Sequence, residues 1–60
     1  MAASQKVGDH IAQAQGMVSV QAECSMSEAL LLMVERAQDQ QQSLEDVVED
    51  VLGRRIRFEL

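Results

Sequence analysis

The sequence contains no proline, tryptophan or tyrosine, and a single phenylalanine is its only aromatic residue. Strands are usually rich in aromatic and β-branched residues, so this scarcity disfavours a β fold. Alanine, leucine, valine, methionine, glutamine and glutamate dominate instead, and most of these favour helices. The composition therefore predicts an all-α fold.

The chain also has few of the residues that enzymes and metal sites use. Cys24 is the only cysteine, so no internal disulfide can form, and His10 is too far from it in sequence to suggest a metal site. The three glycines, Gly8, Gly16 and Gly53, are too widely separated to form a phosphate-binding loop. No nucleophile or carboxylate pair is placed against His10. We therefore expect no catalytic residue, no cofactor and no metal.

Long apolar runs are missing as well. Neither a signal segment nor about 18 consecutive apolar residues occur, so we expect a cytoplasmic protein without a membrane partner. Sixty residues form one domain at most, and a domain of this size buries only about 60% of its unfolded surface. Self-association, as in a homodimer, would help to stabilise it.

Basic residues are scarce and unevenly distributed. The net charge is −5, with two basic against nine acidic residues in positions 1–53 (−7) and three arginines against one glutamate in positions 54–60 (+2). An acidic body argues against broad, nonspecific attraction to nucleic acid. The basic tail fits contact with phosphate or an acidic protein, but arginines after a helix more often complement its dipole and aid solubility.

A first helix is predicted over residues 4–22. Its apolar residues recur at helical spacing, on one face: Val7, Ile11, Ala14, Val18 and Ala22. Gly16 interrupts this helix at a cost of about 1 kcal/mol relative to alanine. We interpret it as a place where another helix approaches closely, or as a contact that needs bare backbone.

A second helix is predicted over residues 26–38. Ser25 and Glu28 have the spacing of a capping box in front of it. Its apolar stripe consists of Met26, Ala29, Leu30, Leu32, Met33 and Ala37. Leu31 and Val34 lie off that stripe, which fits equally a second buried surface such as a dimer contact and a wide face toward the core.

A third helix is predicted over residues 44–52, with Ser43 as its cap and Asp46 at the third helical position. Its apolar residues follow the helical template throughout: Leu44, Val47, Val48, Val51 and Leu52. Gly53 is expected to end it in the left-handed conformation.

The three amphipathic helices and a basic tail over 53–60 predict a single domain over residues 1–60, a small three-helix bundle. We expect Ile56 or Phe58 to fold back over one end of its core.

Four segments, residues 14–18, 25–30, 36–37 and 44–51, resemble the ANTAR domain signature in order and spacing, without a gap from Ile11 to Leu52. The tail over 53–58 resembles that of ANTAR proteins with an N-terminal GAF sensor domain. Three origins fit such a chain: a standalone protein, a truncated gene product and a fragment of a GAF–ANTAR protein.

The resemblance implies a three-helix bundle of the ANTAR type, the RNA-binding output domain of a bacterial transcription antitermination regulator. Such domains form dimers through a preceding coiled coil and bind tandem hairpins in nascent messenger RNA, which prevents a terminator from forming. By this resemblance the RNA-binding residues would be Gln15, Gly16, Leu30, Val34 and Arg36, with Arg54 and Arg55 in the tail.

The chain departs from the family pattern on the expected RNA face. Gln15 replaces a common lysine, Leu30 an aromatic residue, and Val34 and Glu35 basic residues, while Val48 replaces an alanine in the third helix. The first four replacements remove charge or stacking, which weakens phosphate and base contacts. The alternative hypothesis is therefore a protein-interaction or dimerisation module that has lost RNA binding.

Overall fold

The computed structural model describes the backbone of residues 2–59 and the side chains of residues 8–59. Within this range the chain forms three helices and no strand: α1 (Ala2–Ala22), α2 (Met26–Asp39) and α3 (Leu44–Leu52). Every bound lies within two residues of the sequence prediction. The expected all-α, three-helix fold is confirmed.

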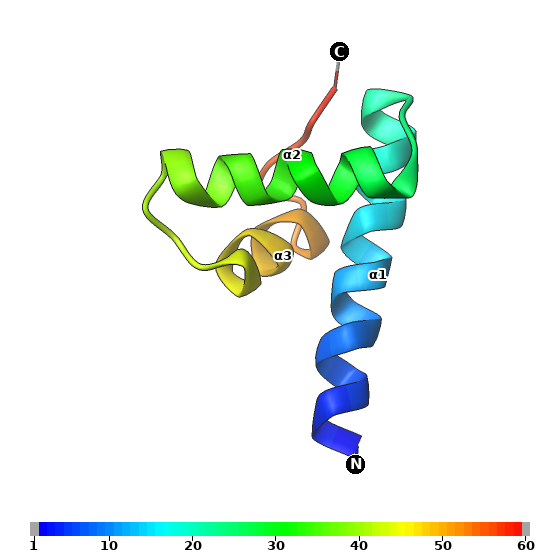
Figure 1. Cartoon of the computed structure of the whole chain (residues 1–60), viewed down its shortest axis with the longest axis vertical. Helices are drawn as coiled ribbons and strands as arrows, with labels where there is room; N and C mark the ends of the chain where they lie inside the picture. Colours follow the sequence, from blue (N-terminus) through cyan, green and yellow to red (C-terminus); the bar gives the residue numbers. More distant parts are fainter. Residues whose placement is uncertain (1, 60) are drawn as a thin grey trace.

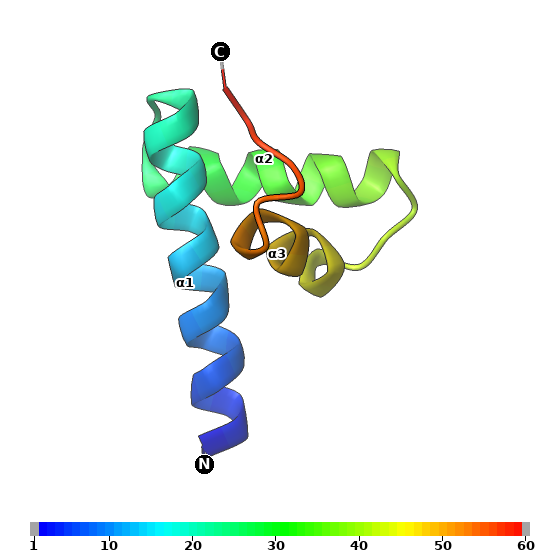
Figure 2. The same ribbon diagram turned by 180° about the vertical axis from the view of Figure 1, so that it is seen from behind.

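The helices do not lie parallel to one another. α2 crosses α1 at 99°, and α3 packs in the angle between them, so that each helix contacts both others (Figure 1). The tail after α3 runs back past α2 toward the C-terminal end of α1, as the view from behind shows (Figure 2). This return brings the two ends of the described chain to opposite sides of α2.

Both predicted capping boxes are present. The Ser25 hydroxyl accepts the N–H of Glu28 at 3.1 Å, and the Glu28 carboxylate accepts the N–H of Ser25 at 3.2 Å. Ser43 and Asp46 repeat the arrangement at 3.1 and 3.4 Å. Because each box satisfies backbone N–H groups that a helix start leaves unpaired, the two serines define where α2 and α3 begin.

The three helices end in the same way. Each is followed by a residue with positive φ, namely Glu23 (53°), Gln41 (55°) and Arg54 (60°). The next residue then donates its N–H to a carbonyl five positions earlier, at 2.8–2.9 Å in all three cases. This is the Schellman motif, which usually has glycine at the left-handed position.

Gly53 does not have the predicted left-handed conformation: its φ is −81°, and Arg54 takes that conformation instead. Gly53 is the C-cap residue of α3, and a side chain at this position would collide with its neighbours. A Cβ there would lie 2.7 Å from Arg55 Nη1 and 3.2 Å from the Glu49 carbonyl oxygen. The glycine therefore serves the close approach of Arg55 rather than an unusual backbone angle.

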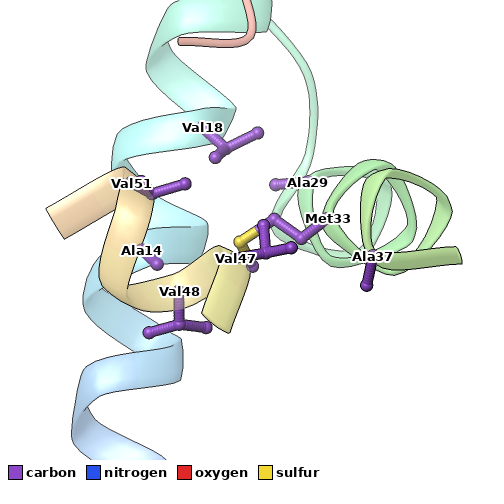
Figure 3. Packing of buried hydrophobic residues seen from close by; sticks show 8 residues of the cluster. All are labelled: Ala14, Val18, Ala29, Met33, Ala37, Val47, Val48 and Val51. Carbon is purple, nitrogen blue, oxygen red and sulfur yellow. The ribbon is translucent and has the colours of Figure 1, made fainter. Parts of the chain in front are cut away.

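The core is small and aliphatic, and all three helices contribute to it (Figure 3). Met33 is the largest side chain that is fully buried, and it reaches from α2 toward Val47 of α3. The buried residues are Ala14, Val18, Ala22, Ala29, Met33, Ala37, Val47, Val48 and Val51. Ile56 and Phe58 of the tail both pack against this cluster, so the expectation that one of them folds back is met by both.

Three expectations about packing need correction. Met26 is 45% exposed rather than part of the buried stripe, because it begins α2 at the corner with α1. Leu31 is 58% exposed, so a wide face toward the core does not account for it. No helix approaches Gly16, since a Cβ there would have no atom within 4 Å. The side chain of Val7 lies outside the described residues.

Candidate functional site

The structure divides the seven residues expected to contact RNA among three places. Gly16 and Arg54 line a groove between α1 and the tail. Leu30 and Val34 lie one turn apart on one side of α2, and Arg36 lies on the other side of its buried face, near Asp50. The last two, Gln15 and Arg55, are hydrogen-bonded within the domain, as described below.

The groove has a volume of about 500 Å³. Its lining consists of Gly16, Met17, Val20 and Gln21 from α1 and Arg54 and Arg57 from the tail. Val20 is 77% exposed although it is apolar, and Gly16 leaves open space where a side chain would stand. The groove thus has an apolar wall on the helix and a basic wall on the tail.

The tail that forms the basic wall is fixed at both ends. Its beginning is the Schellman motif with Arg54 in the left-handed conformation. Its far end is attached to α1, where the backbone N–H of Phe58 donates to the Gln21 side-chain oxygen at 2.9 Å. The groove is therefore formed by the folded chain itself.

The two arginines of the groove differ in their bonding. Arg57 forms an ion pair with Glu59 at 2.9 Å, and both side chains are more than half exposed, so the pair contributes little stability. Arg54 is exposed and makes no ion pair with any residue between positions 8 and 59. Both guanidinium groups can therefore bind an anion at small cost.

Arg55, in contrast, is held by the end of α3. Its Nε donates to Asp50 Oδ1 at 2.9 Å, and its Nη2 donates to the Glu49 carbonyl oxygen at 3.1 Å. The hydrogen bond from Arg55 lowers the pKa of the Asp50 carboxyl, and the charge of Arg36 lowers it further. Arg55 therefore acts as a C-terminal cap of α3, where a positive charge also favours the helix dipole.

Gln15 joins the first two helices. Its side-chain nitrogen donates to the Met26 carbonyl oxygen at 3.0 Å, at the corner where α2 leaves α1. The residue is half-buried and fixes how the two helices meet.

The α2 residues form an apolar strip beside the core. Leu30 and Val34 are half-buried, and the exposed Leu31 continues the strip on the outward side of the helix. Arg36 is half-buried and close enough to Asp50 to influence its carboxyl. The strip of Leu30, Leu31 and Val34 carries no charge and no aromatic side chain, because Arg36 lies on the other side of the buried face of α2.

Sequence reasoning missed four of the six groove residues: Met17, Val20, Gln21 and Arg57. Val20 carried a usable signal, because it is a large apolar residue off the buried stripe of α1. The groove itself had no local signal, since its two walls come from segments far apart in the sequence.

A second, smaller hollow of about 50 Å³ lies between α1 and α3, beside His10, Glu45 and Glu49. It has room for little more than one water, whose share of the liquid is roughly 30 Å³. Among the described side chains, no group of three histidines, cysteines or carboxylates could hold a metal ion.

No single helix within the described range is both long and apolar enough to cross a membrane. Only α1 from Gly8 onward and α2, taken together and bent by 99° between them, have the necessary length and composition.

The fold is that of a small all-α module whose groove has one basic and one partly apolar wall. A family model of the ANTAR domain matches residues 2–52, which include all three helices. The chain therefore belongs to the ANTAR domain family, which is a family of RNA-binding antitermination modules and not of catalysts. No curated protein and no solved structure matches the chain. The tail from residue 53 lies outside the family match.

Proposed function

We propose that this chain is the RNA-binding output domain of a transcription antitermination regulator and recognises hairpin loops in nascent messenger RNA. The observation that carries the proposal is the family match over residues 2–52, from the start of α1 to the end of α3. Hairpin loops suit such a module because their unpaired bases are open to side chains, whereas bases inside an RNA helix are hard to reach.

In this proposal two surfaces contact RNA. Gly16 and Arg54 contribute from the groove, and α2 contributes Leu30 and Val34 from its apolar strip and Arg36 from its other side. Gln15 and Arg55 support these surfaces by holding the α1–α2 corner and the end of α3. Gln15 and Arg55 were expected to touch RNA directly, and their internal hydrogen bonds favour the supporting role.

The charge of the chain sets the expected character of binding. Only five residues are basic and the net charge is −5, so few phosphates can be neutralised. Each neutralised phosphate on single-stranded RNA contributes about 0.7 to the slope of log affinity against log salt. Binding should therefore have a shallow salt dependence and rely strongly on contacts to unpaired bases.

A mobility-shift titration tests the proposal. The RNA is a two-hairpin molecule with randomised loops, and the control is the same stem sequence as a continuous duplex without loops. We expect the protein to bind the hairpin pool at micromolar concentration, with an affinity that falls as salt rises, and to bind the duplex more weakly. Equal binding to both RNAs, or none to the hairpins, contradicts the proposal.

A second candidate function, a dimerisation or protein-interaction module, is favoured by the α2 strip. Leu31 is 58% exposed next to the half-buried Leu30 and Val34, an arrangement that suits a protein contact. Sedimentation equilibrium distinguishes the two candidates. A chain that associates through Leu31, so that Leu31→Ser makes it monomeric, and that binds no hairpin RNA supports the second function. A strict monomer contradicts dimerisation.

A further inference from the structure

We infer that the groove between α1 and the tail holds one unpaired nucleotide of the RNA loop, with its base against Met17 and Val20 and its phosphate at Arg54 and Arg57. The inference rests on the proposed function and deepens it. Two of the six lining residues, Arg54 and Arg57, come from the tail, which lies outside the family match, so family membership assigns this groove no role.

The size and lining of the groove fit a nucleobase. About 500 Å³ falls within the range of roughly 300–1,000 Å³ that is common for small-molecule sites. Val20 exposes an apolar surface there, and the missing side chain of Gly16 leaves the backbone of α1 accessible. An unpaired base that is splayed out of a loop presents a flat face which can pack on such a surface.

The charge distribution places the phosphate. Positions 1–53 carry a charge of −7, so most of the domain repels a nucleic-acid backbone. The groove has two arginines on one wall, of which Arg54 is without an ion pair among the described residues. Arg57 can exchange its exposed pair with Glu59 for a phosphate. A basic wall that can bind a phosphate, next to an apolar wall that can hold a base, matches the chemistry of a nucleotide.

The site is also preorganised. The left-handed backbone at Arg54 and the hydrogen bond from Phe58 to Gln21 fix the basic wall before any ligand binds. Since the Gln21 oxygen accepts the tail N–H, the NH₂ group of that side chain is the end that can donate to a base. A fixed wall lowers the ordering cost of binding.

Filling the groove from its helix wall tests the inference. In Gly16→Leu the new side chain enters open space, because a Cβ at Gly16 would have no atom within 4 Å. Leucine also favours a helix more than glycine does. We expect Gly16→Leu to fold and to be at least as stable as the wild type, but to bind the hairpin pool about tenfold more weakly.

Gly8→Leu is the matched control. Gly8 lies on the same helix, also has open space around a Cβ, and does not line the groove. It should raise stability in the same way and leave the RNA affinity unchanged.

A second variant approaches from the tail wall. Arg54→Gly removes the charge and places glycine where φ is 60°, so the fold should gain stability while affinity falls and the salt slope decreases by about 0.7. Gln41→Gly makes the same backbone change at the end of α2, away from the groove, and should leave binding unchanged.

The outcomes separate the inference from the function. If the wild type binds hairpins and both Gly16→Leu and Arg54→Gly bind as tightly, the groove is empty in the complex and the inference is overturned while the proposed function stands. If the wild type binds no hairpin, both are overturned. If Gly16→Leu alters self-association but not RNA binding, the groove is a protein contact and the inference is overturned. Should Gly16→Leu fail to fold by circular dichroism, Arg54→Gly decides.

Discussion

Three residues in this domain have a backbone conformation that suits glycine, yet none of them is glycine. Glu23, Gln41 and Arg54 have φ between 53° and 60° and follow the three helices. The left-handed conformation costs a residue with a Cβ about 1–2 kcal/mol. In a domain of 60 residues, three such positions take up a large part of the stability that its core can supply.

Gln41→Gly should therefore stabilise the domain. We expect the free energy of unfolding to rise by about 0.5–1 kcal/mol, because the relief at φ 55° exceeds the greater chain entropy of glycine in the unfolded state. Urea denaturation measures this. The control is Gln40→Gly, where φ is −94° and glycine has no advantage, so stability should fall. A loss of stability in Gln41→Gly would show that the left-handed conformation is not strained.

At this scale the sequence predicted helix starts better than helix ends. The pairs Ser25–Glu28 and Ser43–Asp46 carry their own hydrogen-bonding chemistry, which the spacing reveals. The helix ends depend on backbone conformation, and a glutamate, glutamine or arginine gives no sign of a positive φ. The left-handed conformation was predicted at Gly53, but it occurs one residue later, at Arg54, and Gly53 instead leaves room for Arg55.

Among the elements, α3 depends most on its ends, since it has only nine residues. A helix this short is not stable in water by itself. The Ser43 box holds its first turn, and Arg55 holds its last turn through Asp50 and the Glu49 carbonyl oxygen. Side chains at both ends thus satisfy backbone groups that nine residues leave unpaired.

The contribution of Asp50 should depend on pH. Arg55 lowers the pKa of Asp50 in the folded protein below its ordinary value of 3.8, so folding favours the ionised form. The resulting stabilisation is fully present above pH 3.8 and is lost as pH falls through the lower pKa of the folded state.

Thermal unfolding of the wild type and Asp50→Asn across this range measures the effect. The wild type should have the higher melting temperature at neutral pH, and the two melting temperatures should converge in acid. A difference that stays constant as the pH falls would show that the Asp50 charge is not responsible.

Helix extents followed closely from apolar spacing, whereas the exposure of particular residues did not. Spacing tells which residues share a face, but not how far the neighbouring helix reaches along that face. Met26 shares the face of Met33 and still lies 45% exposed at the corner with α1. Crossing at 99° leaves such positions at helix ends uncovered.

The molecule as a whole depends on very few large side chains. Of the nine buried hydrophobic residues, four are alanines and four are valines, which leaves Met33 as the one long side chain among them. Figure 3 shows it reaching from α2 toward Val47 of α3. Loss of this side chain would leave a cavity that three short helices cannot easily close.

Met33→Ala should unfold most of the protein. Replacing a buried methionine by alanine costs about 2–5 kcal/mol, which is comparable to the whole stability of a domain of this size. We expect far-UV circular dichroism to show a large loss of helix at room temperature. Leu31→Ala, on the same helix but 58% exposed, is the control and should retain its helix content. Equal behaviour of both variants would contradict the assigned core.

At the whole-molecule scale the sequence predicted the bundle and a tail that folds back, but not the groove. The hydrogen bond that closes it joins Gln21 and Phe58, which are 37 positions apart. No periodic pattern links such distant residues. The candidate RNA surface therefore came from the family signature, while the joint contribution of Gly16 and Arg57 to one groove required the folded chain.

The returning tail also bears on where this domain ends. The segment shared with the ANTAR family stops at Leu52, yet Ile56 and Phe58 cover the core beyond that point. A protein shortened to the shared segment would contain every helix and still lose apolar cover, the cap provided by Arg55 and one wall of the groove. We therefore expect residues 53–59 to unfold together with the three helices, so that a chain cut after Leu52 melts at a lower temperature than the longer chain.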